Sequence, residues 1–317
     1  MRPLCRFIAE ESKHYRVKDL CQALGVDRSS YYRALKPVAS DGEEVQFRAA
    51  VAEVFFRHSR RYGSRRVDAE LKAEGVAIGR HRVRRMMREQ GLRAIQPKQF
   101  VPKTTDSRHR LGYCDNLLVG RELPPAKPNE VIVGDITYLP LQGGGFAYLA
   151  TWADLFSRLV IGWEVQDNLG ESLILVAFEK GLKRRGNLRA AIVHSDRGGQ
   201  YASVKFRSLL KESGCRQSMS RAEESYDNAY AESLFSRYKA ELLEGGAFSD
   251  VEEARLETFA YIEGYYNRVR RHSSLGYVSP AEYERRWAEE KEGKSGKIVD
   301  NKKEKGVKVK TLSCRKF

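Results

Sequence analysis

The chain has 317 residues and carries 57 lysines and arginines against 42 aspartates and glutamates, a net charge of +15. This excess indicates a polyanionic partner, nucleic acid above all, and the length is sufficient for two or three domains with cores of their own. The five cysteines are scattered and form no CxxC pair, which argues against a disulfide framework or a cysteine zinc site. The sequence also shows no export signal and no apolar run long enough to span a membrane, so we expect a protein of the reducing cytosol.

The positive charge is concentrated towards the two ends of the chain. Residues 1–100 hold 22 basic and 12 acidic residues, and residues 289–317 hold 10 and 5. Residues 101–288 hold 25 of each sign and are neutral overall. A neutral centre between basic arms is the pattern expected of a catalytic core whose affinity for nucleic acid comes mostly from its flanks.

Residues 14–35 predict two short helices around a turn. Gly25 marks the break between them, and Asp27 is the expected N-cap of the second helix. This outline fits a helix-turn-helix that contacts DNA through Ser29, Ser30 and their neighbours. It fits equally well a helical hairpin that binds no DNA, and the sequence does not separate the two interpretations.

A second helical region follows at residues 39–92. The first helix, within 39–62, is expected to bury the face that carries Val45 and Phe56, and a helical pair follows at 63–92. The second helix of that pair is crowded with basic side chains, and only one acid, Glu89, lies among them; its arginines are Arg80, Arg82, Arg84, Arg85 and Arg88. Such a helix either faces phosphates or presents a solvated basic surface, and the density of charge favours the first.

An α/β pattern begins after a proline-containing segment at 93–129 with little periodicity, which we interpret as a linker. Three strands with short connections, expected at 130–139, 146–155 and 158–165, indicate an antiparallel meander. The remaining predicted elements are a helix at 171–186, a strand at 190–196, a helix at 203–214, a strand at 215–219 and a helix that begins at Asp227. This order predicts a ribonuclease-H-like fold with a mixed five-stranded sheet flanked by helices.

Asp135 lies in the middle of the first predicted strand, EVIVGDITYL, where an unpaired carboxylate is costly. Taken alone, it is more simply explained as a structural aspartate whose charge is satisfied. Two other acids change this interpretation: Asp196 closes the fourth strand beside His194, which we expect to be exposed, and Glu232 lies early in the last helix. In this topology the first and fourth strands are adjacent, so Asp135 and Asp196 should meet and the helix should bring Glu232 to them.

Thirty-five residues separate Asp196 from Glu232, and Lys239 follows Glu232 by two helical turns on the same face. Three convergent carboxylates repel one another and require cations. Hard divalent ions with oxygen ligands, Mg²⁺ or Mn²⁺, suit such a site. Two such ions could activate water or a DNA 3′-hydroxyl and stabilise the oxygen that leaves a phosphodiester.

The sequence resembles the second-frame transposases of bacterial insertion sequences of the IS-three type, whose integrase core is related to retroviral integrases. The resemblance runs from about residue 1 to about residue 287. It is carried by the motifs RRYGSRRVDAEL (60–71), TTDS (104–107), PNEVIVGDITYLP (128–140), YLATWADLFSRLVIGW (148–163), VHSDRGGQYAS (193–203), RQSMSR (216–221), YDNAYAESLFSRYKAEL (226–242) and YIEGYYNRVRRHSSLGYVSPAEYE (261–284).

The resemblance implies that Asp135, Asp196 and Glu232 are an Asp-Asp-Glu triad that binds metal, and that Lys239 contacts DNA near the scissile phosphate. It implies cleavage at the element ends and strand transfer into target DNA in a bacterial, nucleoid-associated setting. Implied partners are double-stranded DNA, further copies of the chain in a homo-oligomer, and the upstream-frame product as a fusion or partner. We assign Arg65 and Arg66 to DNA binding together with the arginines of residues 80–88.

The predicted organisation has five parts. They are a helix-turn-helix-like segment (1–38), a helical DNA-binding domain (39–95), a linker (96–127), the catalytic core with C-terminal helices (128–288) and a basic, disordered tail (289–317). The predicted function is that of a metal-dependent DNA transposase of the Asp-Asp-Glu type. The alternative is a DNA-binding regulator of transposition that shares the fold and does no chemistry.

Overall fold

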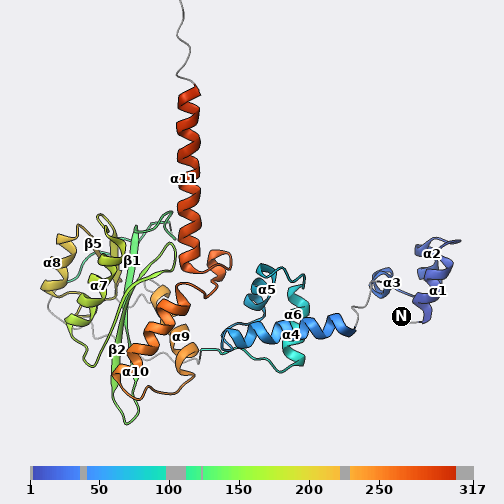
Figure 1. The fold of residues 1–317 in the computed structure, drawn as a ribbon, viewed down its shortest axis with the longest axis horizontal. Coiled ribbons are helices and arrows are strands. Elements are labelled where there is room, and N and C mark those ends of the chain that lie inside the picture. The colour runs from blue at the N-terminus through green and yellow to red at the C-terminus, as the bar shows by residue number, and fades with distance from the viewer. Residues whose placement is uncertain (1–2, 36–40, 98–111, 123, 222–228, 305–317) are drawn as a thin grey trace, which may run out of the picture. The chain divides into compact units, whose positions relative to one another are not determined.

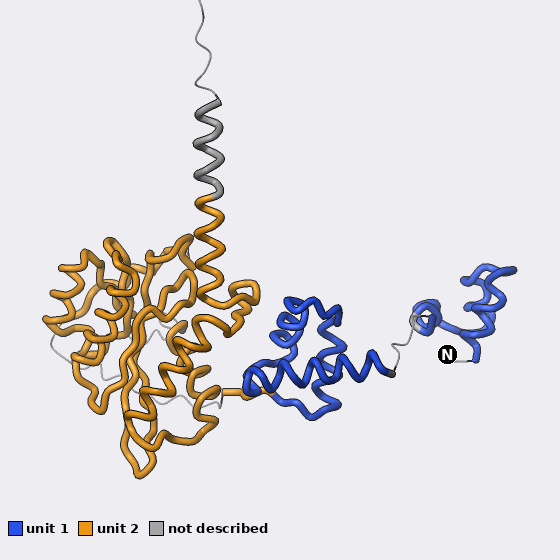
Figure 2. Tube along the Cα trace, viewed as in Figure 1, with its two compact units in different colours: residues 1–93 blue, residues 94–317 orange. Residues whose placement is uncertain are grey.

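The computed structural model describes residues 3–35, 41–97, 112–122, 124–221 and 229–304 (Figure 1). The chain divides into two compact units, residues 1–93 and residues 94–317 (Figure 2). The described part of the first unit is helical, and the second unit contains a five-stranded sheet with helices on both faces. The predicted fold class, an all-α region followed by an α/β core, is therefore confirmed.

Three short helices open the chain: α1 (Pro3–Glu11), α2 (Val17–Ala23) and α3 (Arg28–Leu35). The last two match the prediction for residues 14–35, whereas α1 is a helix that the sequence pattern does not predict. The three helices share one small core, to which α1 contributes Cys5 and Ile8. Asp27 caps α3 as expected, because its carboxylate accepts hydrogen bonds from the Ser30 backbone N–H at 3.1 Å and from the Ser29 hydroxyl.

A second helical group in the first unit consists of α4 (Asp41–Arg57), α5 (Ser64–Ala73) and α6 (Arg80–Glu89). The predicted buried face of the first of these helices is wrong. Val45 and Phe56 are 64% and 61% exposed, while Val51 and Val54 are buried. Apolar residues lie on several sides of α4, so its periodicity does not select one face, and packing against α5 and α6 decides which side is buried.

The sheet of the second unit contains β1 (Val131–Pro140), β2 (Phe146–Asp154), β3 (Val160–Gln166), β4 (Ile192–Ser195) and β5 (Arg216–Met219), in the spatial order β3-β2-β1-β4-β5. β1, β2 and β3 form the predicted antiparallel meander. β4 pairs in parallel with both β1 and β5, so the predicted neighbourhood of the first and fourth strands is also confirmed. β1 is central and has neighbours on both sides.

Helices cover both faces of this sheet. One face packs on α7 (Glu171–Arg185) and α8 (Val204–Glu212), which contribute Phe178 and Phe206 to its core. The other face packs on α9 (Ala229–Leu243), through Leu234, Phe235 and Tyr238. These buried positions of α9 are the ones that its sequence predicts, whereas its expected N-cap, Asp227, lies outside the described residues.

The chain then adds α10 (Val251–Phe259), a π-helical segment (Ala260–Tyr266), a 3₁₀ turn (Ser273–Leu275) and α11 (Pro280–Glu304). α10 and the π-helical segment extend the core on the α9 side of the sheet through Ala254, Tyr261 and Ile262. α11 continues as a helix to Glu304, into the stretch that we expect to be disordered. Residues 305–317 of that predicted tail lie outside the described residues.

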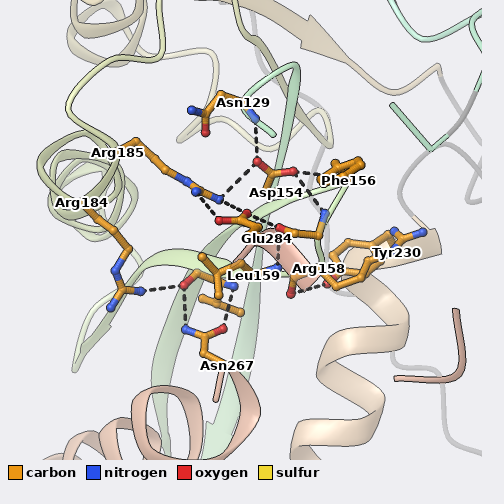
Figure 3. Close-up of polar contacts among 12 residues, drawn as sticks. Asn129, Asp154, Phe156, Arg158, Leu159, Arg184, Arg185, Tyr230, Asn267 and Glu284 are labelled. Atoms are coloured by element: carbon orange, nitrogen blue, oxygen red, sulfur yellow. Dashed lines mark hydrogen bonds and ion pairs between the residues drawn. The ribbon is translucent and has the colours of Figure 1, made fainter. Parts of the chain in front are cut away.

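The end of β2 is fixed by a network of charges around the buried Asp154 (Figure 3). The fully buried Asp154 carboxylate accepts hydrogen bonds from the backbone N–H groups of Asn129, at 2.7 Å, and Phe156, at 2.9 Å. Arg185 of α7 lies 3.3 Å from Asp154 and donates two further hydrogen bonds to Glu284 of α11. α7 and α11 are thereby both connected to the end of β2.

β3 is an edge strand, and side chains form hydrogen bonds with backbone groups on its unpaired edge. Asn267 donates to the Val160 carbonyl and accepts from the Val160 N–H, each at 3.0 Å, and Arg184 donates to the same carbonyl at 2.8 Å (Figure 3). Arg255 donates to the carbonyl of Val165 at 3.2 Å. These contacts remove backbone groups that would otherwise be available for pairing with another strand.

α9 is held to the C-terminal segment by a buried ion pair. Arg270 donates from Nε and Nη2 to both carboxylate oxygens of Glu241, at distances of 2.5 to 3.2 Å, and the Tyr261 hydroxyl adds a third donor at 2.8 Å. Both charged side chains are almost completely buried. Although burial acts to lower the pKa of Arg270, Glu241 together with Tyr261 and Tyr266 raises it by more, so the guanidinium stays charged.

In the part of the chain that the structure describes, no helix combines the length and the apolar character that crossing a membrane requires.

The close contact between β1 and the Trp152 indole gives a first prediction. A Cβ added at Gly134 would lie 2.2 Å from the nearest Trp152 ring atom, so Gly134→Ala should lower the free energy of unfolding by about 3 kcal/mol. Gly264→Ala is the matched control, since a Cβ there meets nothing within 4 Å and the backbone is helical. Chemical denaturation measures both, and an equal effect of the two variants would contradict the packing described.

The Glu241–Arg270 pair gives a second prediction. Arg270→Met leaves a buried carboxylate without its partner cation and should cost about 3–5 kcal/mol of unfolding free energy. Adding Glu241→Gln removes that charge and keeps an acceptor for Tyr261, so the double variant should recover a large part of the loss. Denaturation of the three proteins tests this, and a double variant less stable than Arg270→Met would show that the charge is not the cause.

Candidate functional site

Parallel pairing of β1 and β4 brings two aspartates together. The register sets Val133 of β1 opposite His194 of β4, and continuing it by two residues places Asp135 beside Asp196. Asp135 accepts a hydrogen bond from the Ile136 N–H at 2.8 Å, and Asp196 accepts one from the Gly198 N–H at 2.9 Å. Both side chains are only partly exposed. The meeting of these two residues follows from the strand order that the sequence predicts.

The electrostatics of Asp135 show which other charges converge on it. Burial raises the pKa of Asp135 well above its usual range, and the neighbouring charges of Asp196 and Glu232 raise it further. The Ile136 N–H and the Lys239 ammonium lower the pKa of Asp135. Like charges held near one another in a partly buried place favour either a bound proton or a bound cation.

Glu232 and Lys239 both come from α9 but differ in exposure. Glu232 lies in the first turn of the helix and is exposed, whereas Lys239 is partly buried. Burial lowers the pKa of Lys239, and the charge of Asp135 partly offsets this. Lys239 and Glu232 thus both lie close enough to Asp135 to interact with it electrostatically.

These carboxylates supply the hard oxygen donors that Mg²⁺ and Mn²⁺ prefer. Among the described residues, however, no three His, Cys, Asp or Glu side chains are placed closely enough to hold one metal ion. The aspartate pair is assembled and Glu232 is near it, without forming a closed three-ligand cage. The donor set fits a divalent cation.

His194 is not exposed, contrary to our expectation. Its side chain is completely buried, with Nδ1 at 2.9 Å from the Ser218 hydroxyl and Nε2 at 3.3 Å from the Ser220 hydroxyl. Ser218 also accepts a hydrogen bond from the Leu117 N–H. The imidazole is a buried polar link between β4 and β5. Alternation along β4 puts His194 on the same face as Ile192, and this pattern could have indicated that His194 is buried.

Tyr201 is a residue of this region that the sequence reasoning missed. It follows Asp196 in the turn after β4 and is 2% exposed. Burial raises the pKa of its phenol, and the charges of Asp135 and Asp196 add to the effect, so the phenol is within electrostatic reach of both carboxylates. The motif VHSDRGGQYAS contains this tyrosine, but an aromatic side chain after a strand is ordinarily assigned to the core.

The arginines of α6 fall into two groups. Arg82 and Arg85 donate to the Glu44 carboxylate of α4, at 2.5 and 2.9 Å, and Arg82 also lies over the Phe47 ring. These two contribute to packing within the helical group. Arg80, Arg84 and Arg88 are exposed and recur every fourth residue, which places them along one side of the helix. Arg85 is also exposed, so what separates the two groups is the pairing of Arg82 and Arg85 with Glu44.

The two arginines of α5 also differ. Arg65 is exposed, whereas Arg66 is partly buried and lies over the ring of Tyr62, 5.7 Å from its centroid. Of the two, Arg65 is thus the more accessible.

Comparisons with known families and proteins agree with this architecture. Integrase core domain models match residues 125–225 and 213–280, and an HTH-like domain model matches residues 43–100. The first two matches cover the sheet and its C-terminal helices, and the third covers α4, α5 and α6.

Individual relatives match most of the chain. It is 38% identical to the transposase InsF for insertion sequence IS3A of Escherichia coli (strain K12), over 88% of this chain and 97% of that protein. It is 36% identical to an uncharacterized 31 kDa protein of the insertion element IS600 of Shigella sonnei, over 84% of this chain and 98% of that protein.

Among solved structures, the HTLV-2 integrase catalytic core domain in complex with magnesium aligns at 14% identity with a TM-score of 0.35, over 50% of this chain and 97% of that one. The strand order and the sequence relatives, rather than this weak superposition, carry the assignment. The chain belongs to the family of IS3-type insertion-sequence transposases with an integrase core.

Proposed function

We propose that this protein is a DNA transposase of the Asp-Asp-Glu type, which cleaves the ends of its insertion sequence and joins them to target DNA. The observation that carries the proposal is the β1–β4 register, which supports a shared role for Asp135 and Asp196. The relatives are named transposases, and the acids that such a reaction requires are present. The alternative of a regulator without chemistry is therefore not favoured.

The aspartate pair and Glu232 would hold two divalent cations, Mg²⁺ or Mn²⁺. A cation bound there lowers the pKa of a bound water or 3′-hydroxyl and stabilises the oxygen that leaves the phosphorus. The raised pKa of Asp135 supports this role, because neighbouring carboxylates that repel one another gain most from a bound positive charge.

Lys239 is proposed to contact a DNA phosphate beside the scissile bond. Its partial burial on α9 supports this, because a partly desolvated ammonium interacts more strongly with a phosphate than one in open water. Its distance from the reacting phosphorus would be set by α9, which the Glu241–Arg270 pair fixes to the core.

Double-stranded DNA is the proposed substrate, bound in part by α6 and α5 of the first unit. Arg80, Arg84, Arg88 and Arg65 are the arginines whose exposure supports phosphate contacts. Arg66, Arg82 and Arg85 are proposed to act mainly by shaping that surface. Assembly as a homo-oligomer on DNA and association with the upstream-frame product remain predictions.

The central test is Asp135→Asn. This variant should lower the rate at which pre-cleaved element ends are joined in Mg²⁺ by about 10⁴-fold or more, a loss typical of removing a catalytic group. End binding should persist, and the melting temperature should not fall, because the change removes a repelled charge. Asp167→Asn, at an exposed aspartate after β3, is the control and should join ends normally. Undiminished joining by Asp135→Asn would exclude the proposed site.

The division of the α6 arginines gives a separate test. End binding should become less dependent on salt when Arg80, Arg84 and Arg88 are replaced by alanine. The slope of the logarithm of the binding constant against the logarithm of the salt concentration should fall by up to about 3, at about 0.9 per phosphate contact. The melting temperature of that triple variant should be unchanged. Arg82→Ala should instead destabilise the first unit, because it removes the contacts with Glu44 and Phe47.

Fluorescence anisotropy at several salt concentrations and thermal melting would separate these effects. The assignment fails if Arg82→Ala changes the salt slope more than the triple variant does.

A further inference from the structure

The Tyr201 hydroxyl is a buried polar group beside the aspartate pair. Its oxygen is fully enclosed, and among the residues that the structure describes it has no hydrogen-bond partner. Buried hydroxyls are normally paired, because leaving one unpaired costs free energy of folding. An exception beside two convergent carboxylates calls for an explanation in terms of the site.

The rest of Tyr201 is held firmly in place. Its backbone N–H donates to the Gly198 carbonyl at 3.0 Å, and its carbonyl accepts from the Gln217 side chain at 2.6 Å. Its ring meets the Trp152 ring edge to face, with centroids 5.7 Å apart, and lies 6.0 Å from the Phe206 ring. The hydroxyl therefore keeps its place without a polar partner of its own.

The surroundings connect this tyrosine to both aspartates. Trp152 fits against β1 only because Gly134 has no side chain, and the Trp152 and Tyr201 rings lie together in the core on the α7 and α8 side of the sheet. Gly198, whose N–H donates to Asp196, lies in the same turn as Tyr201, and a Cβ built on it would be 3.5 Å from the tyrosine ring. The Cβ built on Gly198 would also be 3.1 Å from Asp196 Oδ1, so Tyr201 packs against the turn of Asp196, and its phenol is within electrostatic reach of both carboxylates.

We propose that Tyr201 is a positioning residue whose hydroxyl donates a hydrogen bond to a carboxylate oxygen of the Asp135–Asp196 pair when the pair holds a divalent cation. Carboxylates that bind metal are commonly oriented by a hydrogen bond from a neighbouring group. A phenol suits this role, because it is a neutral donor that adds no charge to a crowded site. The inference rests on the metal site proposed above.

The experiment uses the full chain and Mn²⁺ alone, without DNA. Thermal melting is followed as Mn²⁺ is titrated, since a cation that binds the folded state raises the melting temperature. Tyr201→Phe removes only the hydroxyl. Tyr238→Phe is the matched control, because its buried hydroxyl bonds to Thr258 at 2.6 Å. Asp135→Asn reports whether the response arises at the proposed site.

Without metal, Tyr201→Phe should melt at the same or a higher temperature than the parent chain, because it loses an unpaired polar group. Tyr238→Phe should melt at a lower temperature. With metal, the Mn²⁺ concentration at half the melting shift should rise about tenfold for Tyr201→Phe and stay unchanged for Tyr238→Phe. Joining of pre-cleaved ends by Tyr201→Phe should recover when Mn²⁺ is raised above its new midpoint.

Two results would overturn the inference while leaving the metal site intact. One is an unchanged Mn²⁺ midpoint for Tyr201→Phe together with loss of the response in Asp135→Asn. The other is a lower melting temperature for metal-free Tyr201→Phe, which would mean that the hydroxyl already has a stabilising partner. A Mn²⁺ response that is absent in the parent chain, or that survives Asp135→Asn, would instead overturn the proposed metal site and the role of Tyr201 with it.

Discussion

The parallel pairing of β1 with β4 is the constraint on which the rest of the second unit depends. It joins two strands that are distant in the sequence and sets Asp135 beside Asp196 at the point where β4 ends. β2 and β3 on one side and β5 on the other enclose this pair of strands, and helices cover both faces. Without that register the two carboxylates would lie apart.

Placing like charges together is unfavourable, and the raised pKa of Asp135 expresses this cost. Stabilising interactions elsewhere offset this free-energy cost. They are the close fit of Trp152 against Gly134 and the buried Glu241–Arg270 pair that fixes α9. Stabilising contacts away from the site thus hold a group of charges that would otherwise disperse. Such an arrangement suits the divalent-cation site proposed above.

The sequence predicted much of this molecule because its elements are strongly patterned. The strands are β-branched and apolar, and their order with the intervening helices leaves one reasonable topology for the second unit. Prediction failed where pattern was ambiguous or where a side chain's partners are distant in the chain. The buried face of α4, the burial of His194 and the pairing of Arg82 with Glu44 are of this kind. The helix α1 is another, because it is stabilised mainly by its contacts with α2 and α3.

The sequence by itself therefore determined the fold class, the three acidic candidates and the family resemblance, since these depend on residue type, spacing and periodicity. Only the tertiary structure decided that two of the five α6 arginines pair with Glu44, that the three acids do not form a closed cage among the described residues, and that the buried Tyr201 hydroxyl has no hydrogen-bond partner there. The physical reason is that burial, pairing and electrostatic coupling are properties of neighbours in space, which a linear pattern does not specify.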